Sequence, residues 1–343
     1  MGDGGHDGGV FPLRVGLLGA GRIGVFHATV LAEDHRVEEV VVGDVDAKRA
    51  AALAERIGGW SGSIEEVIGS GLDAATIAAT TSAHAGLINA CLDAGLPAFC
   101  EKPVALGYEE TVEIVDRVES SGAILQVGFM RRFDAGYREA RRLIDTGALG
   151  TVYSMHMLGH DHEPPPEEYI PLSGGIFRDL HIHEFDVLRW LTRSEVEEVF
   201  AQGSVRKFDM FARHGDFDTS AIMVRMKCGV LAVITGGRHD PAGYDIRAEI
   251  FGSDDSICVG LDGRTPLRSV EPGVAPPEGQ PYPGFLERFE QAYRDELTHF
   301  LDVVDGRAEN PCTARDSLEA LRIAMAAEVS VAERRPVLLE EIG

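Results

Sequence analysis

Two residues that could move a proton lie four positions apart in the segment SGGIFRDLHIHEFDVLRWL, namely Asp179 and His183. The apolar spacing predicts one long helix over residues 176–191, which would place the two side chains one turn apart on one face, with Asp186 continuing that face. An aspartate beside a histidine can orient the ring and raise its basicity, as a general base needs in order to take a proton from an alcohol. The alternative is a surface pair without a chemical role, which would stabilise the helix by about 0.2–0.5 kcal/mol.

A lysine is predicted to stand at the end of a buried strand. The apolar residues 97–100 indicate that strand, and Glu101, Lys102 and Pro103 follow it. Because proline forces an extended or turning backbone on the residue before it, Lys102 is expected at the strand end rather than on a helix. There it could hydrogen-bond a substrate oxygen and stabilise negative charge on it. The alternative is an ordinary exposed lysine.

A glycine-rich turn near the start of the chain predicts a dinucleotide site. The run 13–18 is apolar and leads into Gly19-x-Gly21-x-x-Gly24 and then into a helical pattern. In such a unit the glycines permit the turn, the approach of a pyrophosphate and close helix packing, and the pyrophosphate lies on the helix N-terminus. Asp44 ends the next apolar run, where a carboxylate can bind the ribose hydroxyls of NAD and repel the 2′-phosphate of NADP. The alternative for Asp44 is a solvated strand end, and Asp46 could be the cap of the next helix.

Further candidates follow the later strands of the same sheet, because ligands bind at the carboxyl ends of parallel strands. The strand 74–79 ends in TTSAHAG, whose hydroxyls and histidine face this edge; a capping or surface role is the alternative for the histidine. We therefore predict that NAD contacts Gly19, Gly21, Arg22, Ile23, Gly24, Asp44, Thr80, Thr81, Ser82, His84, Glu101 and Lys102.

A cluster of histidines raises the question of a metal site. The residues in question are His156, His160, His162, His181 and His183. Their spacing matches no zinc pattern, and hydride transfer to a nicotinamide with a histidine base needs no metal. We therefore expect no metal.

The composition restricts the class of protein. The chain has 343 residues, a hydrophobic content of 44% and a formal net charge of −24. Its length favours two domains, and its charge argues against nucleic acid and membrane partners. No apolar run is long enough to span a bilayer, and the start has no signal-peptide pattern. Five cysteines without C-x-x-C spacing fit buried, unpaired thiols in a reducing cytoplasm, so a cytoplasmic location is expected.

The order of elements predicts an α/β Rossmann domain followed by an α+β domain with a large, open, mostly antiparallel sheet. Strands and helices alternate up to residue 130, and runs of strands follow, after a proline-rich loop that begins at Gly159. Two helices are expected over 283–305 and 313–333, and they could return to the first domain. We assign 1–12 to a flexible N-terminus, 13–130 to NAD binding and 131–343 to substrate binding and oligomerisation.

Several motifs together resemble the Gfo/Idh/MocA family of NAD(P)-dependent oxidoreductases, and within it the myo-inositol 2-dehydrogenase group. The resemblance runs from residue 13 to the C-terminus. It is carried by GAGRIG, CEKP, GFMRRFD, EYIPLSGGIFRDLHIHEFD, GYDIRAEIFGS and FLERFEQAYRDEL.

The resemblance implies roles for particular residues. His183 would be the base, Lys102 would hold the reacting oxygen, and Asp179 would orient base and substrate. Substrate contacts would come from these residues, from Arg131 and Asp134 at the family's pocket positions and from His160 in the equivalent of its substrate loop. Tyr244 and Arg238 are weaker candidates for the wall of the pocket. The resemblance also implies a homo-oligomer, with a tetramer favoured, built through the open sheet.

One segment departs from the family pattern. Inositol dehydrogenases of this type commonly read SRDP where this chain reads GHDHEPPP, so a histidine, His160, stands near the place of an arginine. We expect an NAD-dependent dehydrogenase that oxidises a secondary ring alcohol of myo-inositol or a related cyclitol. The alternatives are a pyranose dehydrogenase, an NAD-dependent glycosidase and a non-catalytic NAD-sensing regulator.

Overall fold

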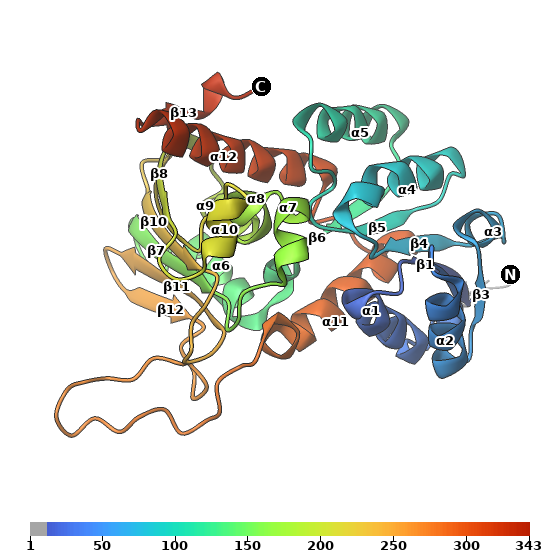
Figure 1. Cartoon of the computed structure of the whole chain (residues 1–343), viewed down its shortest axis with the longest axis horizontal. Helices are drawn as coiled ribbons and strands as arrows, with labels where there is room; N and C mark the ends of the chain where they lie inside the picture. Colours follow the sequence, from blue (N-terminus) through green and yellow to red (C-terminus); the bar gives the residue numbers. More distant parts are fainter. Residues whose placement is uncertain (1–11) are drawn as a thin grey trace, which may run out of the picture. The chain divides into compact units, whose positions relative to one another are not determined.

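The computed structural model describes residues 12–343, so the predicted flexible N-terminus lies, apart from Pro12, outside the described residues. The chain forms two compact units (Figure 1). Of the described residues, the first unit contains 12–101, 116–126 and 297–311, and the second contains 102–115, 127–296 and 312–343. Each unit therefore contains segments that are distant in sequence.

A six-stranded sheet forms the centre of the first unit, with the strand order β3-β2-β1-β4-β5-β6. Strand β1 pairs in parallel with β2 and β4, β2 with β3, and β4 with β5, which confirms the predicted Rossmann arrangement. In chain order the elements are β1 (Leu13–Leu18), α1 (Arg22–Glu33), β2 (Val37–Gly43), α2 (Ala47–Ile57), β3 (Trp60–Gly62), α3 (Ile64–Ile68), β4 (Ala74–Ile77), α4 (Thr81–Asp93), β5 (Ala98–Glu101), α5 (Tyr108–Ser121) and β6 (Leu125–Gly128).

The turn between β1 and α1 depends on two of its glycines. Gly19 has a φ of 110°, and a side chain there would meet backbone atoms of Ala78 and Ala79. A Cβ on Gly24 would lie 2.0 Å from the carbonyl oxygen of Gly19. The turn and the first turn of α1 therefore pack backbone against backbone.

The core of the first unit includes a segment from near the C-terminus. Helix α11 (Phe285–Val304) ends inside this unit, where Leu297, Phe300 and Leu301 pack with residues of β1, α1 and β2. Phe300 also contacts Phe99 of β5, with ring centroids 5.9 Å apart. The last part of α11 thus belongs to the core of the first unit.

A seven-stranded sheet forms the centre of the second unit, with the strand order β12-β11-β7-β10-β9-β8-β13. Only the pairing of β7 with β10 is parallel, so the prediction of a mostly antiparallel sheet is confirmed. The remaining elements are η1 (Met130–Phe133), α6 (Ala135–Asp145), β7 (Val152–His160), η2 (Glu167–Tyr169), α7 (Ile170–Ser173), α8 (Gly175–Asp179), α9 (Ile182–Thr192), β8 (Val196–Ser204), α10 (Asp209–Arg213), β9 (Thr219–Met226), β10 (Leu231–Gly237), β11 (Asp245–Gly252), β12 (Ser256–Val259), α12 (Ala314–Glu333), β13 (Val337–Leu338) and η3 (Leu339–Glu341).

One face of this sheet carries helices. Helix α12 packs against β8 and α9, and α9 contacts β7 (Figure 1). Strand β9 alternates exposed and buried residues along its whole length, because its two sides face different surroundings. On the other side, Met223, Leu231 and Val233 are 60%, 48% and 40% exposed.

The predicted single helix over 176–191 is wrong. Helix α8 ends at Asp179 and α9 begins at Ile182, and between them the N–H groups of Leu180 and His181 both donate to the carbonyl of Ile176, at 3.1 Å. The second of these bonds spans five residues, so the chain gains an extra residue in this turn. The proline-rich segment also differs from the expected loop, because it contains η2 and α7.

Two smaller points concern predictions made from the composition. Cys91, Cys100 and Cys312 are buried, whereas Cys228 is exposed in the turn between β9 and β10, so the prediction of buried thiols is wrong for Cys228. Among residues 12–343, no helix is long and apolar enough to cross a membrane.

The glycine turn yields a prediction with an internal control. Gly24→Ala should lower the free energy of unfolding by about 1–3 kcal/mol, because its Cβ overlaps a backbone oxygen. Gly21→Ala should cost less than about 1 kcal/mol, since nothing lies within 4 Å of a Cβ there and only the helix cap changes. Chemical denaturation followed by circular dichroism would measure both, and equal losses in the two variants would contradict the packing argument.

Candidate active site

The β1–α1 turn is bound to Asp44, the residue after β2. One oxygen of Asp44, Oδ2, accepts from the backbone N–H of Ala20 at 2.7 Å, and the other, Oδ1, accepts from that of Asp46 at 2.8 Å. Burial of Asp44 opposes ionisation, but these two hydrogen bonds and Arg49 hold the pKa of its carboxyl below the usual value. A fixed carboxylate therefore lies beside the turn, as a ribose-binding aspartate requires.

The start of α1 fits a phosphate group. Gly21 is the N-cap residue and supplies no side-chain cap, so the first N–H groups of the helix are not occupied by one. The space around the missing Cβ of Gly21 is open, and Arg22 and Ile23 follow as exposed and half-buried residues. A pyrophosphate bound here would meet backbone N–H groups and the positive end of the helix dipole.

Sequence reasoning missed a cation beside Asp44. The Arg49 guanidinium donates to Asp44 Oδ1 at 2.9 Å from the first turns of α2. Asp46, which the sequence offered as a possible helix cap, is the N-cap of α2 and accepts from the N–H groups of Lys48 and Arg49. Asp44 and Asp46 thus have different places, the first against the glycine turn and the second on the helix.

The hydroxyl residues predicted after β4 form the start of α4. Thr80 is the N-cap residue and Thr81 the first helical residue, and Thr80 Oγ1 lies 3.5 Å from Ser82 Oγ. His84 is buried within α4, and its Nε2 lies 3.1 Å from the carbonyl oxygen of Ala79. His84 thus contacts the backbone of the segment that leads into α4.

Glu101, at the end of β5, is paired with a histidine that sequence reasoning missed. Its Oε1 lies 2.6 Å from Nε2 of His27, and both residues are buried. His27 comes from α1, so the spacing of 74 residues gives no local signal for this pair.

The next residue, Lys102, is bound to Asp179 in the second unit. Lys102 Nζ donates to the backbone carbonyl of Asp179 at 3.0 Å and lies 3.5 Å from its Oδ1. The two side chains are only 18% and 14% exposed. The ammonium group is thus held in one place rather than extended into water.

Two further side chains donate hydrogen bonds to the carboxylate of Asp179. Arg238, 3% exposed, donates to Oδ2 at 2.8 Å, and the hydroxyl of Tyr169 donates to Oδ1 at 3.0 Å. Arg238 also lies 3.6 Å from Asp161. Burial opposes ionisation of Asp179, but Arg238 and Lys102 hold its pKa below the usual value, so the residue is ionised at neutral pH.

His183 lies near this cluster without a recorded bond to Asp179. Its ring meets that of Phe129 edge to face, with centroids 6.4 Å apart, and its Nδ1 is buried without a hydrogen bond in the described part of the chain. Burial lowers the pKa of His183 well below its usual value, and the charges of Lys102 and Arg131 lower it further. The ring is therefore neutral, which a proton acceptor requires.

Asp186 does not continue the predicted face. It is buried, and both its oxygens accept from Arg132, whose guanidinium also reaches Asp316 at 3.0 Å. Because the helix is interrupted before Ile182, the four-residue spacing of a straight helix does not extend from α8 into α9. This aspartate belongs to an internal ion pair.

Arg131 is enclosed as well. It is 1% exposed and pairs with Glu184, which also lies 3.5 Å from Nδ1 of His181. The Nε2 of His181 lies 2.7 Å from the hydroxyl of Ser220. Burial alone would raise the pKa of Glu184, but the charge of Arg131 lowers it to about 2. The resemblance implied that Arg131 contacts the substrate. In the structure its side chain is already paired with Glu184.

The other predicted substrate residues differ in their availability. Asp134 caps α6 and accepts from Arg288 at 2.9 Å, so structural contacts occupy it. His160 ends β7, with Nδ1 3.8 Å from Asp240, and is partly exposed. Tyr244 is buried, which raises the pKa of its hydroxyl, and lies within the electrostatic reach of Arg131.

Asp161 follows His160 and faces the same cations as Asp179. Burial raises the pKa of Asp161 to about 6, with Asp179 adding to the rise and Arg238 opposing it. The second unit thus brings Lys102, Asp161, Asp179 and Arg238 together, and the first holds the predicted cofactor residues up to Glu101.

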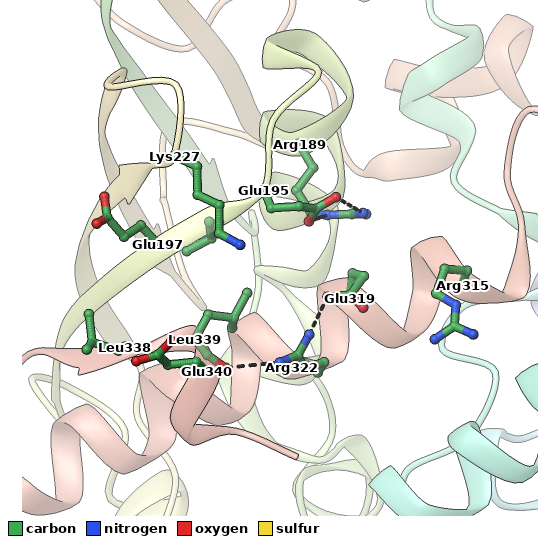
Figure 2. Close-up of a pocket in the computed structure, with 11 residues that line it drawn as sticks. Arg189, Glu195, Glu197, Lys227, Arg315, Glu319, Arg322, Leu338, Leu339 and Glu340 are labelled. Atoms are coloured by element: carbon green, nitrogen blue, oxygen red, sulfur yellow. Dashed lines mark hydrogen bonds and ion pairs between the residues drawn. The ribbon is translucent and has the colours of Figure 1, made fainter.

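A separate cavity of about 600 Å³ in the second unit contains none of these residues (Figure 2). Two of its arginines pair with carboxylates, Arg189 with Glu195 at 2.7 Å and Arg322 with Glu319 at 2.8 Å. Since positive and negative side chains alternate around it, its charge favours neither an anion nor a cation.

Comparison with known proteins gives matches to both parts of the chain. The family model described as "Oxidoreductase family, NAD-binding Rossmann fold" matches residues 13–129, and that described as "GFO/IDH/MocA C-terminal domain" matches residues 137–258.

Similar proteins cover almost the whole chain. The myo-inositol dehydrogenase Hyg17 of Streptomyces leeuwenhoekii is 37% identical over 93% of this chain and 97% of its own. The scyllo-inositol 2-dehydrogenase (NAD(+)) of Bacillus subtilis is 34% identical over 96% of each. The crystal structure of a putative myo-inositol dehydrogenase from Sinorhizobium meliloti has a TM-score of 0.88 at 34% identity, covering 95% of this chain and 99% of that one. The chain therefore belongs to the Gfo/Idh/MocA family of oxidoreductases.

Proposed function

We propose that this protein is an NAD-dependent dehydrogenase that oxidises a secondary ring alcohol of a cyclitol to a ketone. The observation that carries the proposal is the group formed by Lys102 and a neutral His183, in which the lysine is fixed and its charge reaches the histidine. Relatives that are named as inositol dehydrogenases support a cyclitol as the substrate class.

The first unit would hold the cofactor. The β1–α1 turn would bind the pyrophosphate and Asp44 the ribose, and the residues at the start of α4 would also contact the cofactor. When bound, NAD accepts the hydride from the carbon of the alcohol. The protein contributes binding and orientation.

The second unit would supply the proton acceptor and the charge. His183 takes the hydroxyl proton, and Lys102 donates a hydrogen bond to the oxygen as negative charge builds on it. Asp179 holds Lys102 through its backbone carbonyl, and no hydrogen bond within residues 12–343 joins it to His183. That Asp179 orients base and substrate stays a prediction.

The segment that departs from the family pattern would select the cyclitol. His160 and Asp161 begin it, and the carboxyl of Asp161 lies beside Arg238, where it can accept a hydrogen bond from a ring hydroxyl. Myo-inositol, scyllo-inositol and pyranoses differ in the positions of their hydroxyls, so this segment can distinguish them.

The proposal predicts the effect of removing either group. Lys102→Met should lower kcat about 10²–10³-fold through lost charge stabilisation. His183→Ala should lower it about 10²–10⁴-fold through lost proton transfer. The measurement is NADH formation with inositol isomers and common pyranoses.

Matched controls separate these effects from general damage. Lys227→Met and His35→Ala change an exposed lysine and an 87% exposed histidine, and should leave kcat within about twofold. No turnover of any polyol by the wild type, with NAD still bound, would contradict the dehydrogenase proposal. Release of an aglycone from glycosides would then indicate a glycosidase. Absence of turnover with glycosides as well would indicate a regulator.

The environment of His183 yields a prediction about pH. Because burial and two cations lower its pKa, protonation of His183 should begin well below pH 6.5, and kcat/KM should not fall through loss of this base above that pH. Lys102→Met should raise the pKa of His183, since it removes a positive charge. A ¹⁵N NMR titration of the ring would measure the pKa of His183 in the wild type and in the Lys102→Met variant. An unchanged pKa in the variant would contradict the electrostatic link.

Cofactor selectivity depends on Asp44 and Arg49, which should act in opposite directions. Asp44→Asn should lower the preference for NADH over NADPH about tenfold or more, because it removes the charge that repels the 2′-phosphate. Arg49→Gln should raise that preference, because it removes the cation that partly neutralises Asp44. The rise should be at most about fivefold, since an exposed arginine screens the carboxylate only weakly. Dissociation constants from NADH and NADPH fluorescence test this, and shifts of the same sign would contradict it.

A further inference from the structure

His181 is a buried residue to which the proposed function gives no role. It is one of the histidines whose spacing raised the question of a metal site, and its side chain is fully buried in the second unit. Its backbone lies in the break between α8 and α9, where its N–H donates to the carbonyl of Ile176 at 3.1 Å. It is also the N-cap residue of α9, although its side chain makes no cap hydrogen bond. The ring therefore has its contacts elsewhere.

The His181 ring contacts both helices and the sheet. Its Nε2 lies 2.7 Å from the hydroxyl of Ser220 on β9, and its Nδ1 lies 3.5 Å from Oε2 of Glu184 on α9. The ring also packs against those of Phe177 on α8 and Phe185 on α9, with centroids 6.1 Å and 6.0 Å apart. One side chain thus joins the end of α8 and the start of α9 to β9.

The sheet carries a row of small residues where this ring packs. They occupy matching register positions on β7, β10, β9 and β8, and are Gly159, Gly236, Ser220 and Gly203. A Cβ on Gly236 would lie 2.4 Å from Cε1 and from Nε2 of His181, and a Cβ on Gly159 would lie 2.9 Å from Oε1 of Glu184. The missing side chains therefore leave the space that the ring and the carboxylate occupy.

The requirement for glycine at position 236 comes from the ring. The φ of Gly236 lies outside the left-handed range, so an alanine there would not strain the backbone by its conformation. The other near atom is Cδ2 of Leu180, at 3.1 Å, which is the end of a flexible side chain. The imidazole of His181 is thus the group that excludes a side chain from this point of β10.

The place of His181 in the chain connects the ring to the candidate site. The carbonyl of His181 accepts from the N–H of Phe185 at 3.0 Å, so His181 fixes the start of α9. His183 follows two residues later, in the first turn of that helix. Asp179 precedes His181 by two residues, and its carbonyl binds Lys102. The anchored ring therefore lies between the residue that holds the lysine and the proposed base.

We propose that His181 is a positioning residue for the reaction proposed above. Its ring packs over Gly236 and holds the break between α8 and α9, and the break sets the places of Asp179 and His183. This inference rests on the proposed function, because the groups that it positions are the proposed base and the residue that holds the lysine. A displacement of about 1 Å can lower a rate about 10²-fold, so a buried anchor can control turnover without touching the substrate.

Removal of the ring tests the proposal. His181→Ala should lower kcat for the cyclitol about tenfold or more, because the base and the lysine are less well placed. The pKa of His183 should rise toward its usual value, since a loosened α9 admits water to a ring whose pKa burial lowers. The dissociation constant of NADH should stay within about twofold, because the predicted cofactor residues up to Glu101 lie in the other unit. Steady-state kinetics, a ¹⁵N NMR titration and NADH fluorescence measure these three quantities.

A second pair of variants tests the contact between the ring and the sheet. Gly236→Ala should also lower kcat about tenfold or more, because its Cβ displaces the His181 ring. In a chain that already carries His181→Ala, the same glycine substitution should change kcat less than about twofold, since no ring is left to displace. His181→Gln should retain more activity than His181→Ala, because its amide nitrogen can still reach Ser220.

Two controls separate positioning from general damage. Val224→Ala removes apolar atoms from a side chain that is 2% exposed on β9, so it should lower stability while kcat and the pKa of His183 stay as in the wild type. Gly263→Ala is the matched glycine control, because nothing lies within 4 Å of a Cβ there and its φ is outside the left-handed range. It should keep the wild-type kcat.

The readouts distinguish failure of this proposal from failure of the proposed function. If His181→Ala left kcat and the pKa of His183 unchanged, as Val224→Ala should, the positioning role would be overturned. A loss from Gly236→Ala that persists in full without the ring would overturn it as well. The titration of His183 needs no substrate, so it decides on His181 even if a wild type without polyol turnover contradicts the proposed function.

Discussion

The buried ion pair between Arg238 and Asp179 is the interaction on which the candidate site depends. Asp179 ends α8, and its carboxylate is held by Arg238 at 2.8 Å and by Tyr169 at 3.0 Å. In an unbroken helix the carbonyl of Asp179 would accept the N–H of His183. Here the extra residue in the turn leaves that carbonyl for Lys102, and a cation at the end of a helix is also favoured by the helix dipole. The helix break that defeats the simple aspartate–histidine pairing is thus what anchors the lysine.

The charges around His183 show how a base and a cation can share one site. Lys102 and Arg131 both favour the neutral ring, so the histidine stays available for a proton at neutral pH. Each cation lies beside a carboxylate, Asp179 for the lysine and Glu184 for the arginine, and Asp179 also pairs with Arg238. Removing Glu184 would leave the buried charge of Arg131 without its carboxylate, which costs about 3–5 kcal/mol. The carboxylates therefore stabilise the cations, and the cations add to the effect of burial, which lowers the pKa of His183 most.

Sequence reasoning reached the parts of the structure that local rules determine. Glycines that require a positive φ or a close approach, and an aspartate after a β-branched strand, have local signatures, and the Rossmann strands follow apolar runs. The break after Asp179 has none, because Ile176, Phe177, Leu180 and Ile182 continue an apolar helical pattern through it. Partners distant in the sequence were missed because they too have no local signature. Tyr169 lay in a segment expected to be a loop, and Glu184 gave no sign that it would occupy Arg131.

The chain passes from one unit to the other between residues 101 and 102, and this affects how the site can be built. Glu101 is fixed in the first unit by His27, at 2.6 Å. Lys102 is fixed in the second by Asp179, at 3.0 Å. Two consecutive residues are therefore anchored by different cores, and only one peptide bond joins the strand that ends the cofactor-binding part to the lysine proposed to stabilise the reacting oxygen.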